Sequence, residues 1–273
     1  IQISGDVILV LGEGTTLTAP KGIELSQGNS LTIEGTGALT IDGCDDNKSG
    51  IGAGQVGTLV INGGTINVKG GFFGAGIGGD YNNSGGGSIT INGGVVNATG
   101  GNYAAGIGGG SDNTKGNYGV CGDIVINGGQ VTATGGQAPG ASTGTPPGVG
   151  PGFEWAASDI NGSDIGYSSG TLTIGWTNID DFFKNSGFRT NKGSTFNSIT
   201  IAAGKQIIIA GTETPIDNTT GNLVNVLAGK TVWGYNYDLP ITLADNDTYR
   251  READLRTASA TYTKTVSDNQ RRA

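Results

Sequence analysis

The sequence predicts an all-β fold, a right-handed parallel β-helix with a less regular C-terminal end. Three observations support this prediction. One short phrase recurs along the chain, each copy alternates with the period of a β-strand, and glycine accounts for 54 of 273 residues. An average protein has about 7% glycine. Because the glycines recur in register and there are only seven prolines, the composition indicates an ordered repeat rather than disorder.

The repeat is clearest in three units. They read TLVINGGTINVKGG at 58–71, SITINGGVVNATGG at 88–101 and DIVINGGQVTATGG at 123–136, and a weaker copy, SLTIEGTGALTIDG, occupies 30–43. Units of this length that cannot bury a face alone are typical of stacked architectures. No copy carries a helical stripe of apolar residues, so helical solenoids fit poorly.

Each unit has the same local design. In the second unit Ile89 and Ile91 are expected on one face of a strand and Thr90 on the other. Asn-Gly-Gly then supplies a bend, because Asn and Gly tolerate a positive φ. An isolated hairpin is the alternative for an Asn-Gly step, but the regular spacing favours parallel stacking of coils.

Stacking predicts which residues lie above one another. Ile61, Ile91 and Ile126 are expected to form an interior stack. The asparagines that follow them, Asn62, Asn92 and Asn127, are expected to form a hydrogen-bonded ladder at the bend, with Asp42 at its end.

The glycine-rich stretches between units need a separate explanation. AGIGG occurs at 75–79 and 105–109, with GIGAG at 50–54. We expect a narrow corner of the coil, in which Ile77 or Ile107 fills the core and the glycines let backbones approach. A phosphate-binding loop is disfavoured because neither a helix nor a lysine follows in the expected place.

The chain is expected to divide into three parts. Residues 1–183 would hold the glycine-rich coils, 184–235 the final coils and a cap, and 236–273 terminal strands or a linker. Charge changes near residue 170: residues 1–170 carry 4 − 13 = −9, and residues 171–273 carry 11 − 10 = +1. The segment 137–157 interrupts the repeat and is expected to be a long loop or a distorted coil. Its Phe153 and Trp155 would pack on the helix or form a ligand platform.

Composition excludes several functions. A net charge of −8 disfavours nucleic-acid binding, and the absence of His rules out Ser-His-Asp or Cys-His catalysis and disfavours zinc. No run of about 18 apolar residues is present to span a membrane. Glycoside hydrolysis needs only two carboxylates, but the adjacent pairs Asp45-Asp46 and Asp180-Asp181 would point to opposite faces of a strand. The sequence therefore predicts that the chain is not an enzyme and holds no cofactor, with a polysaccharide lyase or hydrolase as a less favoured alternative.

Polar loops interrupt the coils and are expected to emerge on one side. They mix carboxylates and amides with aromatic rings, which suits sugars because rings stack on pyranose faces while polar groups bond hydroxyls. The predicted glycan-binding residues are Asp80, Tyr81, Asn82, Tyr103, Asp112, Asn113, Tyr118 and Trp155. Solvated turns are the structural alternative. Structural calcium stays open, although no loop has EF-hand spacing.

Two cysteines in an exported protein would suggest a disulfide. Cys44 and Cys121, however, are expected two to three coils apart, too far for direct bridging. The sequence predicts two separate, mostly buried thiols.

The alternation of ITINGG with AGIGGG resembles the glycine-rich repeats of large secreted or surface proteins of gut-type bacteria. It is similar to right-handed β-helix adhesins and carbohydrate-binding β-helix modules. The resemblance covers about residues 1–183. It implies export, a place at the cell surface or outside the cell, and binding of a glycan or host-surface component. A structural spacer that displays other domains is the alternative. No catalytic motif comes with the resemblance.

Overall fold

The structure is a computed structural model that describes most of the chain up to residue 153 and, beyond it, separate strands. The described residues are 1–26, 28–42, 44–53, 57–82, 87–112, 119–139, 146–153, 168–174, 182–185, 195–201, 205–210, 224–226, 228–235, 241–243 and 249–251.

Three parallel sheets form the walls of a solenoid. Sheet 1 has six short strands, in the order β1 (Gln2–Ile3), β4 (Ile23–Leu25), β7 (Ile51–Ala53), β10 (Ile77–Gly78), β13 (Ile107–Gly108) and β16 (Val149–Gly150). Sheet 2 has nine strands, in the order β2 (Asp6–Leu11), β5 (Ser30–Gly35), β8 (Thr58–Ile61), β11 (Ser88–Ile91), β14 (Ile124–Ile126), β17 (Ser168–Ile174), β19 (Thr195–Ile201), β21 (Val224–Val226) and β23 (Ile241–Leu243). Sheet 3 begins with β3 (Thr16–Thr18), β6 (Ala38–Ile41), β9 (Thr65–Lys69), β12 (Val95–Thr99), β15 (Gln130–Thr134) and β18 (Phe182–Asn185).

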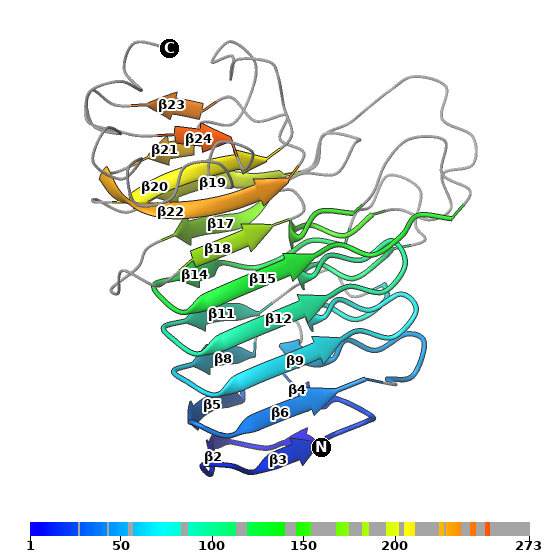
Figure 1. The fold of residues 1–273 in the computed structure, drawn as a ribbon. Coiled ribbons are helices and arrows are strands. Elements are labelled where there is room, and N and C mark those ends of the chain that lie inside the picture. The colour runs from blue at the N-terminus through cyan, green and yellow to red at the C-terminus, as the bar shows by residue number, and fades with distance from the viewer. Residues whose placement is uncertain are drawn as a thin grey trace.

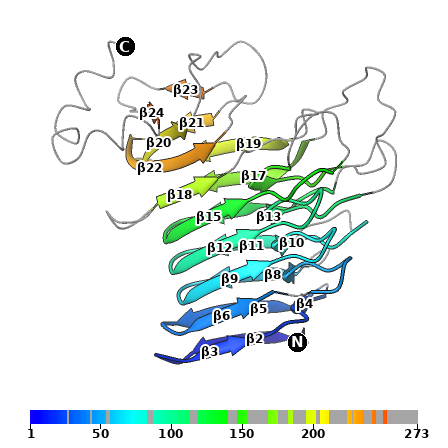
Figure 2. The same cartoon turned by 45° about the vertical axis from the view of Figure 1, so that its right-hand side comes forward.

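The chain visits sheets 1, 2 and 3 in turn and rises by one strand per circuit. In Figure 1 it crosses the front wall along sheet 3 to the right and returns along sheet 2 behind, while it climbs towards the C-terminus. Figure 2 shows the same stack of coils from another side. This circuit is right-handed, as parallel β connections almost always are. The predicted right-handed parallel β-helix is confirmed.

The interior stack is the predicted one. Ile61 pairs with Ile91, Ile91 pairs with Ile126, and all three side chains are fully buried. Thr90 lies between two buried isoleucines and points outward. Each coil therefore supplies one layer of the core and relies on its neighbours for backbone hydrogen bonds, which explains why the phrase must repeat.

The asparagine ladder is confirmed, but its predicted end is wrong. Asn92 donates to Asn62 and Asn127 donates to Asn92, each at 2.9 Å. Ile33 pairs with Ile61, so the residue below Asn62 is Glu34. Asp42 belongs to another column, because Ile41 pairs with Val68 and places Asp42 beside Lys69.

The AGIGG stretches contribute strands to sheet 1 and do not form only a corner. Ile77 pairs with Ile107, and both are fully buried. Gly78 has a φ of +132°, and a Cβ there would lie 2.0 Å from the carbonyl oxygen of Gly108. A side chain cannot be accommodated at this approach, so the glycine is obligatory.

The described part of the segment 137–157 includes a stretch that belongs to a coil. Residues 146–153 return to register, since Ile107 pairs with Val149 and Gly108 with Gly150. Phe153 is buried, which agrees with packing on the helix, and Trp155 lies outside the described residues.

Strand order becomes irregular near the C-terminus. Sheet 3 continues from β18 to β22 (Ala228–Tyr235), then to β20 (Lys205–Ala210) and β24 (Tyr249–Arg251), which departs from chain order. The less regular C-terminal end is thus confirmed. The division of the chain at residues 183 and 235 stays a prediction.

Both cysteines are thiols, as predicted. Cys44 is half-buried and Cys121 is buried. Among the described residues, no helix has the length and hydropathy needed to cross a membrane.

Candidate functional site

The loop that follows β9 folds back on itself around Ile77. The backbone N–H of Ala75 donates to the carbonyl of Gly79 at 3.0 Å, which closes the loop. Phe73 precedes this closure and Tyr81 follows it, so their rings meet. The ring centroids lie 4.8 Å apart in a stacked arrangement.

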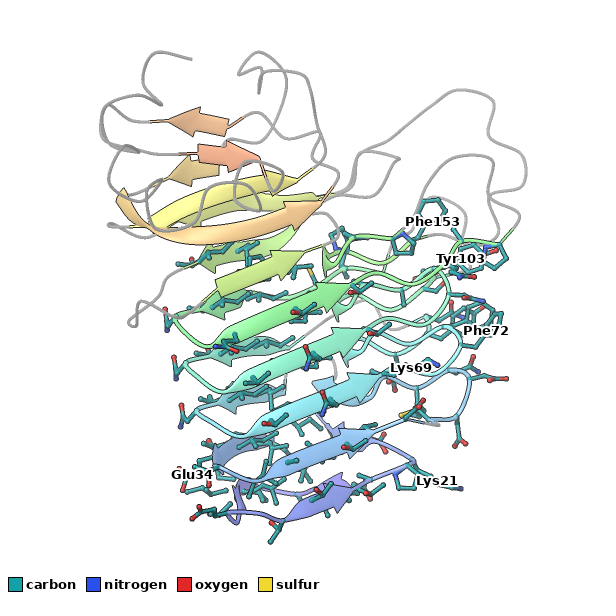
Figure 3. All side chains as sticks on the ribbon, in the orientation of Figure 1. Lys21, Glu34, Lys69, Phe72, Tyr103 and Phe153 are labelled. Carbon is teal, nitrogen blue, oxygen red and sulfur yellow. The ribbon has the colours of Figure 1, made fainter. Side chains whose placement is uncertain are left out.

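Five rings form what we call the aromatic stack: Phe72, Phe73, Tyr81, Tyr103 and Phe153. Phe73 lies 6.2 Å from Tyr103, Tyr103 lies 6.1 Å from Phe153, and Phe72 meets Phe73 edge-on at 4.6 Å. These separations are favourable for aromatic pairs. The stack runs along the loop side of the solenoid, where Figure 3 labels Phe72, Tyr103 and Phe153.

Exposure falls along the aromatic stack towards the C-terminus. Phe72 is 48% exposed, and Phe73 and Tyr81 are half-buried. Tyr103 is only 8% exposed and Phe153 1%. Only the first coil of the stack therefore presents ring faces and edges to solvent.

Two of the predicted glycan-binding residues lie beneath the surface. The hydroxyl of Tyr103 donates to the carbonyl of Pro139, and its backbone φ is +62°, unusual for a tyrosine. Asp112 is 3% exposed, and its N–H donates to Phe153 at 3.4 Å. These residues hold the loops together, and neither presents its side chain at the surface.

Asp80 is the centre of a polar network beside the aromatic stack. One carboxylate oxygen accepts hydrogen bonds from the N–H and the hydroxyl of Ser49, at 2.8 and 2.7 Å. The other accepts from Lys48 at 2.8 Å, and Lys48 also reaches Glu24 at 3.4 Å. The hydrogen bond that Lys48 donates to Asp80 is the main reason that the pKa of Lys48 is raised, with the charges of Asp80 and Glu24 adding to it and partial burial opposing it.

A hollow of about 130 Å³ lies over this network. It is lined by Lys21, Ile23, Glu24, Asp45, Lys48, Ser49, Gly52 and Asp80. Gly52 forms part of the floor, where a Cβ would lie 2.7 Å from the hydroxyl oxygen of Ser49. We call this feature the charged hollow.

The loop at 45–49 connects the charged hollow to the aromatic stack. The backbone carbonyl of Asp46 accepts from the N–H of Phe73 at 2.6 Å, and that of Asn47 accepts from the N–H of Tyr81 at 3.0 Å. Asn82 follows, exposed and with a φ of +55°, and its backbone N–H donates to the carbonyl of Ser111 at 2.9 Å. Backbone bonds thus fix the rings and the carboxylate relative to each other, which is the preorganisation a binding surface needs.

The structure brings together Asp80, Tyr81 and Asn82 of the predicted site. Asn113, Tyr118 and Trp155 lie outside the described residues. Sequence reasoning missed Phe72 and Lys48. A signal for the loop was available, because Phe73 and Tyr103 are 30 residues apart, the same separation as Ile77 and Ile107.

Within the part of the chain that the structure describes, no group of three or more acidic or cysteine side chains is arranged to hold a metal ion. Asp80 and Glu24 are instead bridged by a lysine.

Three stretches of the chain match the family model described as Beta helix repeat. They are residues 59–81, 89–111 and 124–148. The matches begin at Leu59, Ile89 and Ile124, which pair with one another in the structure, so each match starts at the same point of its coil. No curated protein and no solved structure matches the chain.

Proposed function

We propose that this chain is a non-catalytic, adhesin-like module that acts at a bacterial surface or outside the cell and binds a glycan or another host-surface component. The observation that carries the proposal is the exposed end of the aromatic stack beside the charged hollow. The β-helix repeats are compatible with such a role, because a solenoid presents rows of loops on a rigid support.

The chemistry of this surface suits a sugar. Phe72 and Tyr81 offer apolar ring surface for the C–H face of a pyranose. Asp80 and Asn82 lie next to Tyr81 and offer acceptors and donors for hydroxyl groups. The hollow is small and open, which fits a terminal sugar or a short branch rather than a buried cofactor.

Nucleic acid and catalysis are not part of the proposal. A net charge of −8 would repel a phosphate backbone. Of the three carboxylates that line the hollow, Glu24 and Asp80 are bonded by Lys48, and three donors occupy the oxygens of Asp80. A carboxylate held in this way is a poor candidate for passing a proton to a glycosidic oxygen.

A glycan array with the purified chain, run with and without calcium, tests the proposal. We expect selective binding to a set of related glycans and loss of that binding in Phe72→Ala and Tyr81→Ala. Val10→Ala is the matched control. Val10 is an exposed apolar side chain on sheet 2, and it does not line the hollow. Calcium dependence would add a metal to the site.

A blank array in both conditions would contradict glycan binding. The second candidate function, a spacer that displays other domains, would then be favoured. Its supporting observation is mechanical: one apolar core and an external asparagine ladder run through successive coils without interruption.

A further inference from the structure

The outward face of sheet 3 is a second surface with an unusual composition. In Figure 1 this sheet forms the front wall, from β3 to β15. Its outward side chains are exposed or half-buried and are almost all hydroxyls, amides or small apolar groups. They are Thr16, Thr18, Ala38, Thr40, Thr65, Asn67, Lys69, Val95, Asn97, Thr99, Gln130, Thr132 and Thr134.

These side chains stand in columns, since the five strands pair in register. The central column is Thr18, Thr40, Asn67, Asn97 and Thr132, one residue from each coil. Strands are about 4.8 Å apart, so the column repeats one polar group at that spacing over roughly 20 Å. Asn97 donates to Asn67 at 2.9 Å, which makes a second amide ladder and fixes both side chains.

This face is nearly uncharged in a strongly acidic protein. Among the outward residues of β3, β6, β9, β12 and β15, Lys69 alone is charged, and it lies 3.8 Å from Asp42. The outward positions of sheet 2 differ, because they include Glu34 and the exposed apolar side chains Ile8 and Val10. Neutral polarity therefore runs through all five strands of sheet 3, whereas in sheet 2 the outward side carries charge at Asp6 in β2 and Glu34 in β5.

We propose that the outward face of sheet 3 binds a neutral, linear polysaccharide that lies along the axis of the solenoid. The coil spacing is close to the length of one β-1,4-linked sugar unit, so successive sugars would meet the same hydroxyl and amide groups on successive coils. Threonine methyls, Ala38 and Val95 supply apolar contact for sugar C–H groups. The low charge of the described outward residues, among which only Lys69 is charged, matches a neutral polymer, whereas the protein's −8 would repel an anionic one.

Affinity at such a face comes from repetition. Each coil contributes a weak contact, but a polymer already held at one coil meets the next at a high effective concentration. The ladder and the sheet are rigid, so little side-chain entropy remains to be lost on binding. This surface stands apart from the loop-side site proposed above, and either could act without the other.

Depletion of the purified chain by particles of cellulose, chitin and mannan tests the inference. We expect adsorption to at least one of these neutral polymers. The double variant Thr40→Glu/Thr132→Glu places two charges on the face and leaves the Asn67–Asn97 ladder in place. It should bind at least about tenfold more weakly, because several linked contacts are lost together.

Thr90→Glu is the matched control, since Thr90 is an equally half-buried outward residue on sheet 2. It should adsorb like the original chain, and so should Phe72→Ala. Thermal unfolding of each variant is the control that tests whether the fold is retained. No adsorption of the original chain to any of the three polymers would overturn the inference, as would an equal loss in Thr90→Glu. Loss only in Phe72→Ala would overturn it while supporting the loop-side site.

Discussion

The amide nitrogen of Asn92 donates a hydrogen bond of 2.9 Å to the side-chain oxygen of Asn62, 30 residues earlier in the chain. Asn127 makes the same bond to Asn92. One residue type at one point of the repeat thus links successive coils on their outer surface. The ladder runs beside the buried isoleucines, which pack the same coils from within.

Asn92→Ala should lower the free energy of unfolding by about 1–2 kcal/mol, because it removes two exposed ladder bonds worth about 0.5–1.5 kcal/mol each. Urea titration followed by circular dichroism measures the change. Asn97→Ala, which removes the single bond to Asn67, should cost less. An equal decrease in the free energy of unfolding in the two variants would contradict the idea that stability depends on the number of ladder hydrogen bonds removed.

Gly78→Ala should prevent folding or cost more than about 4 kcal/mol. The new methyl would lie 2.0 Å from the oxygen of Gly108, and alanine is strained at a φ of +132°. Soluble yield and thermal unfolding are the measurements. Gly14→Ala separates the two causes, since Gly14 has a φ of +69° and nothing within 4 Å of a Cβ. We expect it to cost only about 1–2 kcal/mol. Similar losses in both variants would show that close approach is unimportant.

Asp80→Asn should destabilise the loop side more than Glu24→Gln. Asp80 accepts hydrogen bonds from both the N–H and the hydroxyl of Ser49, which is only 4% exposed. Replacing the carboxylate by an amide weakens the acceptor for these buried donors, which should lower the free energy of unfolding by about 1–3 kcal/mol. Glu24 is exposed and makes one long bond to Lys48, worth at most about 0.5 kcal/mol. Urea midpoints compare the two. A greater effect of Glu24→Gln would show that the bond from Lys48 to Glu24 contributes more to stability than the bonds from Ser49 to Asp80.

The raised pKa of Lys48 predicts a pH dependence. A lysine whose pKa is higher in the folded state stabilises the fold below its ordinary value of 10.5, and this contribution is lost as the pH rises through the folded pKa. Lys48 is 44% exposed, so solvent screening limits the contribution to about 0.5–1 kcal/mol. Lys48→Met should therefore reduce stability at pH 8 and narrow its gap to the original chain above pH 10.5. Thermal midpoints across this range, with Lys21→Met as control, provide the test. A gap that stays constant with pH would contradict it.

Cys44 should react slowly with iodoacetamide at pH 8. Burial is the largest cause of the raised pKa of its thiol, and the charges of Asp45 and Asp80 raise it further. Little thiolate is therefore present. Cys121 should react more slowly still because it is buried. Mass spectrometry of the alkylated chain measures both rates, and unfolding in urea should make the two rates similar. Fast labelling of Cys44 in the folded chain would contradict the predicted environment.

The register of the three clearest coils could be predicted from the sequence alone. Alternation places Ile89 and Ile91 on one side of a strand, and repetition at 30 and 35 residues places Ile61 and Ile126 in the same column. These are local properties, because a period of two and a glycine bend act within a few residues. The ladder follows from the same register. Asp42 was misplaced because the weaker copy at 30–43 aligns with its neighbour through Glu34, a shift that only strand pairing reveals.

Exposure was decided by the tertiary structure. Tyr103 and Phe72 occur in similar glycine-rich loops, yet one is buried and the other nearly half exposed. The difference arises because Tyr103 is covered by residues far along the chain, Pro139 and Phe153, whereas Phe72 lies at the open end of the aromatic stack. Sequence period determined the coil, its core and its ladder, since each needs only the neighbouring repeat. Burial of a loop side chain depends on which distant segments cross it, and that was settled only when the coils were stacked.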